Sequence, residues 1–202
     1  LQTLDELIFS EDPGESRSEI YNLAKKLSND VKVPIQFLKN KPFQHRYIME
    51  AVRSELIRIY TLGLTGFDTP GSVQAIPEAQ SSLYGMIQAL KQYEELALSR
   101  GIQKQYQALI SGLIGYKTYL AENPDFDSLD RMFILRNFMN PLYKQIYDFQ
   151  RALNIEFREE VDPTMSSINY HAESIFSDDF LNPPFFAEIA SSDLYDEKKI
   201  EL

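Results

Sequence analysis

The sequence predicts an all-α protein: an up-and-down bundle of about four to five helices, followed by an extended C-terminal segment. Apolar residues recur at spacings of three and four in several long stretches, and no stretch alternates with the period of two that a strand requires. The connections between these stretches are short, which favours antiparallel neighbours. With 202 residues and 44% hydrophobic content, the chain fits one helical body over residues 1–157 and an appended segment over residues 158–202.

The first predicted helices lie on either side of residue 40. After a helix-breaking Asp12-Pro13-Gly14, residues 16–31 carry one apolar stripe, made of Ile20, Leu23, Ala24, Leu27 and Val31. A second stripe over residues 43–62 contains Ile48, Val52, Leu56 and Ile59, and it ends where two glycines open a loop.

Two further helices are predicted in the middle of the chain. Pro77, followed by Glu78 in the first turn, starts a helix that runs to about Arg100 and ends at Gly101. Residues 102–120 form the next amphipathic stretch. Gly112 and Gly115 flank its apolar stripe, so we expect a neighbouring helix to approach closely there.

The last predicted helix begins near Asp127, whose side chain is expected to cap it together with Asp130. Its apolar residues cover more than one face, which indicates a central position in the bundle. Pro141 removes a backbone donor and should bend this helix.

Residues 158–202 differ from the rest in charge and in aromatic content. The segment holds eleven acidic and three basic residues, whereas residues 1–157 hold nineteen and seventeen, so most of the net charge of -10 lies in the segment. This distribution argues against a surface that tracks phosphates, so we expect no nucleic-acid partner, and it favours a basic partner surface. Because disordered linkers are poor in aromatic residues, we expect the segment to dock, either on its own bundle or on a second domain. The candidate docking residues are Tyr170, Phe176, Phe180, Phe185 and Phe186.

The residues reveal no catalytic, cofactor-binding or metal-binding motif. The sequence has no cysteine, and its two histidines, His45 and His171, are interpreted as structural because a transition-metal site needs three or four converging ligands. The carboxylates of residues 125–130 lack the glycine and the distal glutamate of a calcium loop, which favours helix capping. We therefore expect this chain not to be an enzyme in itself. No apolar run approaches the roughly 20 residues that a membrane span requires.

Four charged residues are candidates for structural ion pairs. By helical phase Glu94 falls on an apolar face, and Arg131 and Arg136 lie in a mostly apolar helix. Because a buried charge must be paired, we expect bridges from these arginines to Asp68 or Glu94.

Three motifs carry a resemblance to a known family. LTGFDTP at residues 64–70, LDRMFILRNFMNPLYKQIYDFQRAL at 129–153 and INYHAESIFSDDFLNPPFF at 168–186 resemble the N-terminal helical region of Bacteroidetes-type di-haem cytochrome c peroxidases. The resemblance implies a non-catalytic region with a structural, docking or regulatory role. It also implies C-terminal domains of the same chain that hold two c-type haems, which would begin close to residue 202, and a small cytochrome as electron donor. The parent protein would be periplasmic, or attached to the membrane through an N-terminal lipid anchor, and would reduce hydrogen peroxide.

Two alternatives stay open from the residues. A weaker similarity is to imelysin-like helical envelope proteins linked to iron acquisition, but their GxHxxE motif is not found in this sequence. A helical adaptor that binds another protein through the acidic segment is the third reading, and it needs no cofactor.

Overall fold

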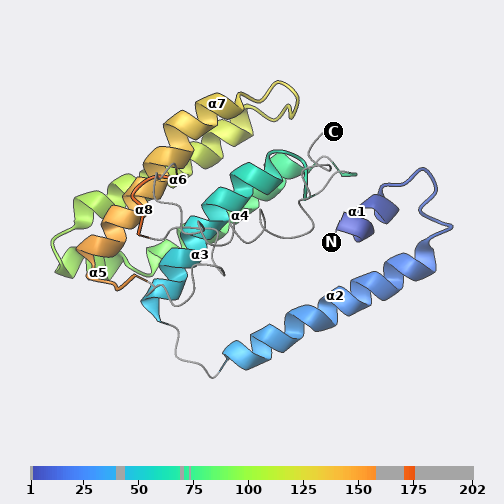
Figure 1. Cartoon of the computed structure of the whole chain (residues 1–202), viewed down its shortest axis with the longest axis horizontal. Coiled ribbons are helices and arrows are strands. Elements are labelled where there is room, and N and C mark those ends of the chain that lie inside the picture. Colours follow the sequence, from blue (N-terminus) through green and yellow to red (C-terminus); the bar gives the residue numbers. More distant parts are fainter. Residues whose placement is uncertain (1, 40–43, 69–70, 73, 158–170, 176–202) are drawn as a thin grey trace, which may run out of the picture.

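The computed structural model describes residues 2–39, 44–68, 71–72, 74–157 and 171–175. Within these residues the secondary structure is helical and contains no strand, which confirms the predicted fold class (Figure 1).

Four helices form a closed ring. They are α3 (His45–Arg58), α4 (Ala75–Lys91), α6 (Gln103–Glu122) and α8 (Asn140–Ala152), and each packs on two others in the order α3, α4, α6, α8 and back to α3. His45, at the start of α3, meets Tyr93, which lies just beyond α4. Tyr106, near the start of α6, packs against Phe149, near the end of α8. Neighbouring helices are therefore antiparallel, as expected for an up-and-down bundle.

The apolar faces predicted for residues 43–62, 77–100 and 102–120 and for the last helix form the core of this ring. The fully buried side chains include Met49, Leu56, Leu83, Leu90, Leu109, Leu113, Tyr116, Ile146 and Phe149. Gly112 lies at the closest approach of α6 and α8, since a Cβ atom there would lie 2.8 Å from Cδ2 of Leu142. Leu142 is itself buried, so the expected role of Gly112 as a close-contact residue is confirmed.

Two π-helical turns interrupt the ring helices: η1 (Ile59–Gly63) follows α3, and η2 (Leu135–Met139) separates the short α7 (Arg131–Ile134) from α8. Buried positions jump by five residues across both turns, from Ile59 to Leu64 and from Ile134 to Met139. A π turn holds one residue more than an α turn, so the inward face is kept across each of them. The interruption expected around Pro141 takes this form, with the proline in the first turn of α8.

Two predicted helix boundaries are wrong. The helix expected from Pro77 to Arg100 begins at Ala75, ends at Lys91 and restarts as α5 (Glu94–Ser99). The N–H group of Tyr93 bonds to the carbonyl of Leu90, three residues back, which tightens the chain between the two helices.

The cap of the last helix also differs from the prediction. Asp130, and not Asp127, is the N-cap of α7, because its carboxylate accepts a 2.8 Å hydrogen bond from the N–H group of Phe133. Asp125 accepts bonds from the N–H groups of Asp127 and Ser128 and forms a separate turn. Leu129, which follows this turn, is buried in the hydrophobic core, and the helix begins only after it.

The N-terminal helices lie outside the ring (Figure 1). They are α1 (Gln2–Ile8) and α2 (Arg17–Leu38), which pack on each other. The carboxylate of Asp5 accepts hydrogen bonds from the N–H groups of Gly71 and Ser72, which ties α1 to the loop before α4. Helix α2 is longer than the predicted 16–31, includes Pro34 and has no buried residue.

Candidate docking site for the C-terminal segment

Residues 171–175 lie on the face that α3 and α8 share. They run against the direction of α8, because Glu173 meets Lys144 and the next residue, Ser174, meets Asn140 at the start of that helix. Ile175 packs on the hydrophobic core. This stretch includes His171, Ala172 and Glu173 of the predicted docking segment, so part of that segment is held by its own bundle.

Arg53 is the central side chain of this site. It lies on α3 and is fully buried, with its guanidinium 4.2 Å from the ring centre of Tyr143 and 5.4 Å from that of Tyr147. Its Nη2 donates a 2.6 Å hydrogen bond to the carbonyl of Ala172. A planar guanidinium stacks on aromatic rings and still donates in its own plane, which a lysine ammonium cannot do. Arg53 therefore joins the segment to both helices at once.

A polar rim surrounds this buried contact. Lys144 donates to Glu173 over 2.9 Å, and Arg151 lies 3.9 Å from the same carboxylate. The hydrogen bond from Lys144 lowers the pKa of the Glu173 carboxyl, and the same bond raises the pKa of Lys144. The hydroxyl of Ser174 donates to the amide oxygen of Asn140 over 2.9 Å. These groups are exposed or half-buried, so they orient the segment more than they stabilise it.

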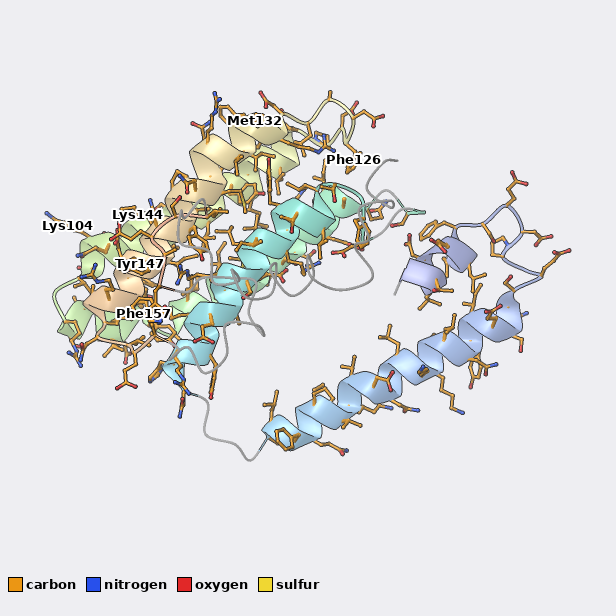
Figure 2. All side chains as sticks on the ribbon, viewed as in Figure 1. Lys104, Phe126, Met132, Lys144, Tyr147 and Phe157 are labelled. Atoms are coloured by element: carbon orange, nitrogen blue, oxygen red, sulfur yellow. The ribbon has the colours of Figure 1, made fainter. Side chains whose placement is uncertain are left out.

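Tilted ring pairs continue the contact beyond α8. Tyr147 and Phe157 have ring centres 5.0 Å apart, and Phe157 and His171 have ring centres 5.5 Å apart. Lys144, Tyr147 and Phe157 follow one another along this end of the molecule in Figure 2. His171 thus takes part in a ring contact, in agreement with the structural role predicted for it.

The five aromatic residues predicted to dock, Tyr170, Phe176, Phe180, Phe185 and Phe186, lie outside the described residues. Sequence reasoning missed Arg53, although the signal was available. Arg53 lies one residue after Val52 and three before Leu56, which places a charge on the apolar stripe of its helix.

The predicted ion pairs form with different partners. Asp68 pairs with Arg58, which also lies 2.7 Å from Glu55. Burial acts to raise the pKa of the Glu55 carboxyl, but the hydrogen bonds from Arg58 and Ser82 outweigh it, so this pKa is lowered. The prediction that Arg131 or Arg136 pairs with Asp68 is therefore wrong.

Arg131 instead donates to backbone carbonyls. Its bonds reach Leu64 at 2.8 Å, Phe126 at 2.9 Å and Leu129 at 3.2 Å. Three carbonyls replace a carboxylate because two loops converge on this guanidinium, and their oxygens lack helical partners. Arg136 and Glu94 are exposed, so burial does not require a partner for them. The restart of the helix at Glu94 changes its phase and turns it to solvent.

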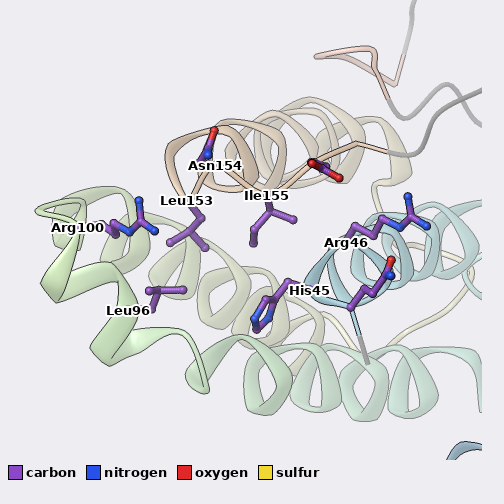
Figure 3. Close-up of a pocket in the computed structure, with 9 residues that line it drawn as sticks. His45, Arg46, Leu96, Arg100, Leu153, Asn154 and Ile155 are labelled. Atoms are coloured by element: carbon purple, nitrogen blue, oxygen red, sulfur yellow. The ribbon is translucent and has the colours of Figure 1, made fainter. Parts of the chain in front are cut away.

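A second candidate site is the pocket between the start of α3, α5 and the residues that follow α8 (Figure 3). It has a volume of about 520 Å³, and Leu153 and Ile155 face His45 and Leu96 across it, with Arg46 and Arg100 on opposite sides. His45 begins α3, and its Nδ1 lies 3.0 Å from the hydroxyl of Tyr93. Burial raises the pKa of Tyr93, which keeps the phenol neutral.

This pocket lacks the convergence of groups that catalysis or metal binding requires. His45 lies within hydrogen-bond distance of Tyr93, and Arg46 and Arg100 lie on opposite sides of the pocket. Among the described residues, no group of three or more His, Cys, Asp or Glu side chains could hold a metal ion. In the Arg53 site, by contrast, two aromatic rings and a backbone carbonyl meet at one buried guanidinium.

Comparison with protein-family models, curated proteins and solved structures finds no match to this chain. None of the helices in the described part of the chain is both long and apolar enough for a membrane crossing.

Proposed function

We propose that this chain is the non-catalytic N-terminal helical region of an exported di-haem cytochrome c peroxidase. Its role would be to hold the start of the following chain on a rigid bundle. The sequence motifs that resemble this family support the proposal, and so does their arrangement in space. Arg131, in the second motif, bonds to Leu64 in the first, and Lys144, also in the second, bonds to Glu173 in the third.

The single observation that carries the proposal is the contact of Arg53 with Ala172. Because residues 171–175 run back along α8, this stretch is held at a defined place on the bundle, with Ser174 at Asn140. A segment fixed in this way would orient a catalytic domain joined to it. In this proposal two c-type haems belong to the following domains, since thioether attachment of haem needs cysteine and this chain has none.

The experiment is to express the complete natural gene product with the machinery for c-type cytochromes. The proposal expects two covalently bound haems per chain in a pyridine haemochrome assay, and oxidation of a reduced small cytochrome when peroxide is added. A product without covalent haem would refute it, and would leave the imelysin-like or adaptor alternative.

The role of the bundle is tested in the same protein with Arg53→Met. Haem content should stay at two per chain, whereas turnover with the cytochrome donor should fall as the domains lose their relative orientation. Unchanged turnover would refute the orienting role and leave the family assignment intact.

A further inference from the structure

Helix α2 presents an apolar stripe that no described element of the ring covers. The stripe continues the predicted one through Val31, Ile35 and Leu38, which recur at spacings of four and three. The exposed fractions of these three side chains are 48%, 51% and 42%. The contacts of α2 with α1 leave Leu23 and Leu27 half-buried, so the uncovered part is the C-terminal half of the helix.

One margin of this stripe is basic, although the protein as a whole is acidic. Residues 17–41 contain six basic and two acidic residues, a net charge of +4 in a chain of net charge -10. By helical phase, Lys32 and then Lys25 lie along one side of the stripe, whereas Asp30 and Glu19 lie closest to it on the other side. An occupant of this face should therefore be apolar in its centre and acidic at the edge that meets these lysines.

Residues 176–202 have this composition. They contain five aromatic residues, with seven acidic and two basic ones, which gives a net charge of -5. The docking of Ile175 on the bundle fixes where this stretch begins. Its 27 residues can extend by about 90 Å, whereas the 22 residues of α2 make a rod of about 33 Å, so the chain is long enough.

We propose that residues 176–202 cover the apolar face of α2 within the same molecule. The rings of Phe176, Phe180, Phe185 and Phe186 contact the stripe, and the carboxylates between them pair with the flanking lysines. A covalently connected segment reaches effective concentrations on the order of millimolar, so it competes well against a second molecule. This inference does not depend on the proposed haem domains, and it applies equally if the chain belongs to one of the alternative classes of protein.

The test uses the absence of cysteine from the sequence, which allows a single thiol to be placed at will. Ile35→Cys places it on the stripe, and Asn29→Cys places it on the opposite side of the same helix as a matched control. The reaction rate of each thiol with a maleimide is measured in the full chain and in a chain that ends at Ile175. We expect the thiol at position 35 to react about tenfold more slowly in the full chain, which corresponds to ~1.4 kcal/mol of covering. The thiol at position 29 should react equally fast in both chains.

A second variant tests the charge component. Changing Lys25 and Lys32 to Glu leaves the stripe intact but reverses one margin, and it should remove most of the protection at position 35. In the chain with unaltered lysines, raising the salt concentration should weaken the protection of the thiol at position 35. The reason is that exposed charges are screened over about 8 Å at physiological ionic strength.

Three results would overturn the proposal. One is an equal reaction rate at position 35 with and without residues 176–202. Another is protection that grows with protein concentration in the shortened chain, which would assign the face to a second copy. The third is protection that appears only with vesicles of anionic lipid, which would assign the face to a membrane surface.

Discussion

Replacing Arg53 by methionine tests whether one buried cation holds the C-terminal segment on the bundle. Methionine keeps much of the volume and the flexible stem but removes the charge and the donors. The lost bond to the carbonyl of Ala172 is a hydrogen bond from a charged donor, which contributes about 1.5–3 kcal/mol. The stacking over Tyr143 contributes about 2 kcal/mol when desolvated.

These gains are partly offset in the native protein, because burying a guanidinium carries a desolvation cost that methionine does not have. We therefore expect a net loss of about 2–3 kcal/mol in the free energy of unfolding, measured by urea denaturation. Amide hydrogen exchange should show a larger local effect, since residues 172–175 lose their contact even where the helices stay folded.

Two controls separate this reasoning from general damage. Arg53→Lys keeps the charge and loses the planar stacking, so its stability should fall between those of the native protein and Arg53→Met. Arg46→Met, on the same helix but outside the site, should leave the urea midpoint nearly unchanged. The reasoning is refuted if Arg53→Met unfolds at the native urea concentration with residues 172–175 still protected from exchange.

Further predictions concern the core and the loop that follows α3. Gly112→Ala should destabilise the protein by about 1 kcal/mol through overpacking against α8, whereas Gly85→Ala, with no atom within 4 Å of its new Cβ, should stabilise it by about 1 kcal/mol; thermal denaturation would show opposite shifts. Tyr116→Phe removes a buried hydroxyl that has no hydrogen-bond partner among the residues that the structure describes, so its free energy of unfolding should be equal to or up to about 1 kcal/mol above the native value, and a loss of stability would contradict this. The folded-state pKa of Glu55 lies below its ordinary value, so its stabilising contribution is present above that ordinary pKa and is lost as the pH falls through the lowered one. Urea titrations from pH 7 to pH 3 should accordingly show a shallower loss for Glu55→Gln than for the native protein, and parallel curves would rule out the pairing with Arg58.

The fold class and the core faces follow from the sequence because they depend on local periodicity. Leu56, Leu83 and Leu113 fall on predicted stripes and are buried in the structure. The boundaries were less predictable. The break at Tyr93 has no glycine or proline to mark it, and the start of α7 depends on the burial of Leu129, which is a tertiary contact.

The candidate site was predictable only in part. The sequence indicated that the acidic, aromatic segment docks, and the contacts of Ala172 and Glu173 place part of it on the bundle. The partner Arg53 was missed because a single arginine inside an amphipathic helix usually extends to solvent. The pairing of Asp68 with Arg58 depends on how the loop after η1 folds back, and periodicity carries no information about that path.

The π turns have a consequence for how the sequence can change in length. Removing one residue from an ordinary helix rotates everything beyond it by about 100° and turns buried side chains to solvent. Removing one residue from η1 or η2 would convert the five-residue spacing from Ile59 to Leu64, or from Ile134 to Met139, into the four-residue spacing of an α-helix. Both inward faces would then be retained. These two turns are thus the positions at which the bundle helices can lose a residue while the register of the chain on either side is preserved.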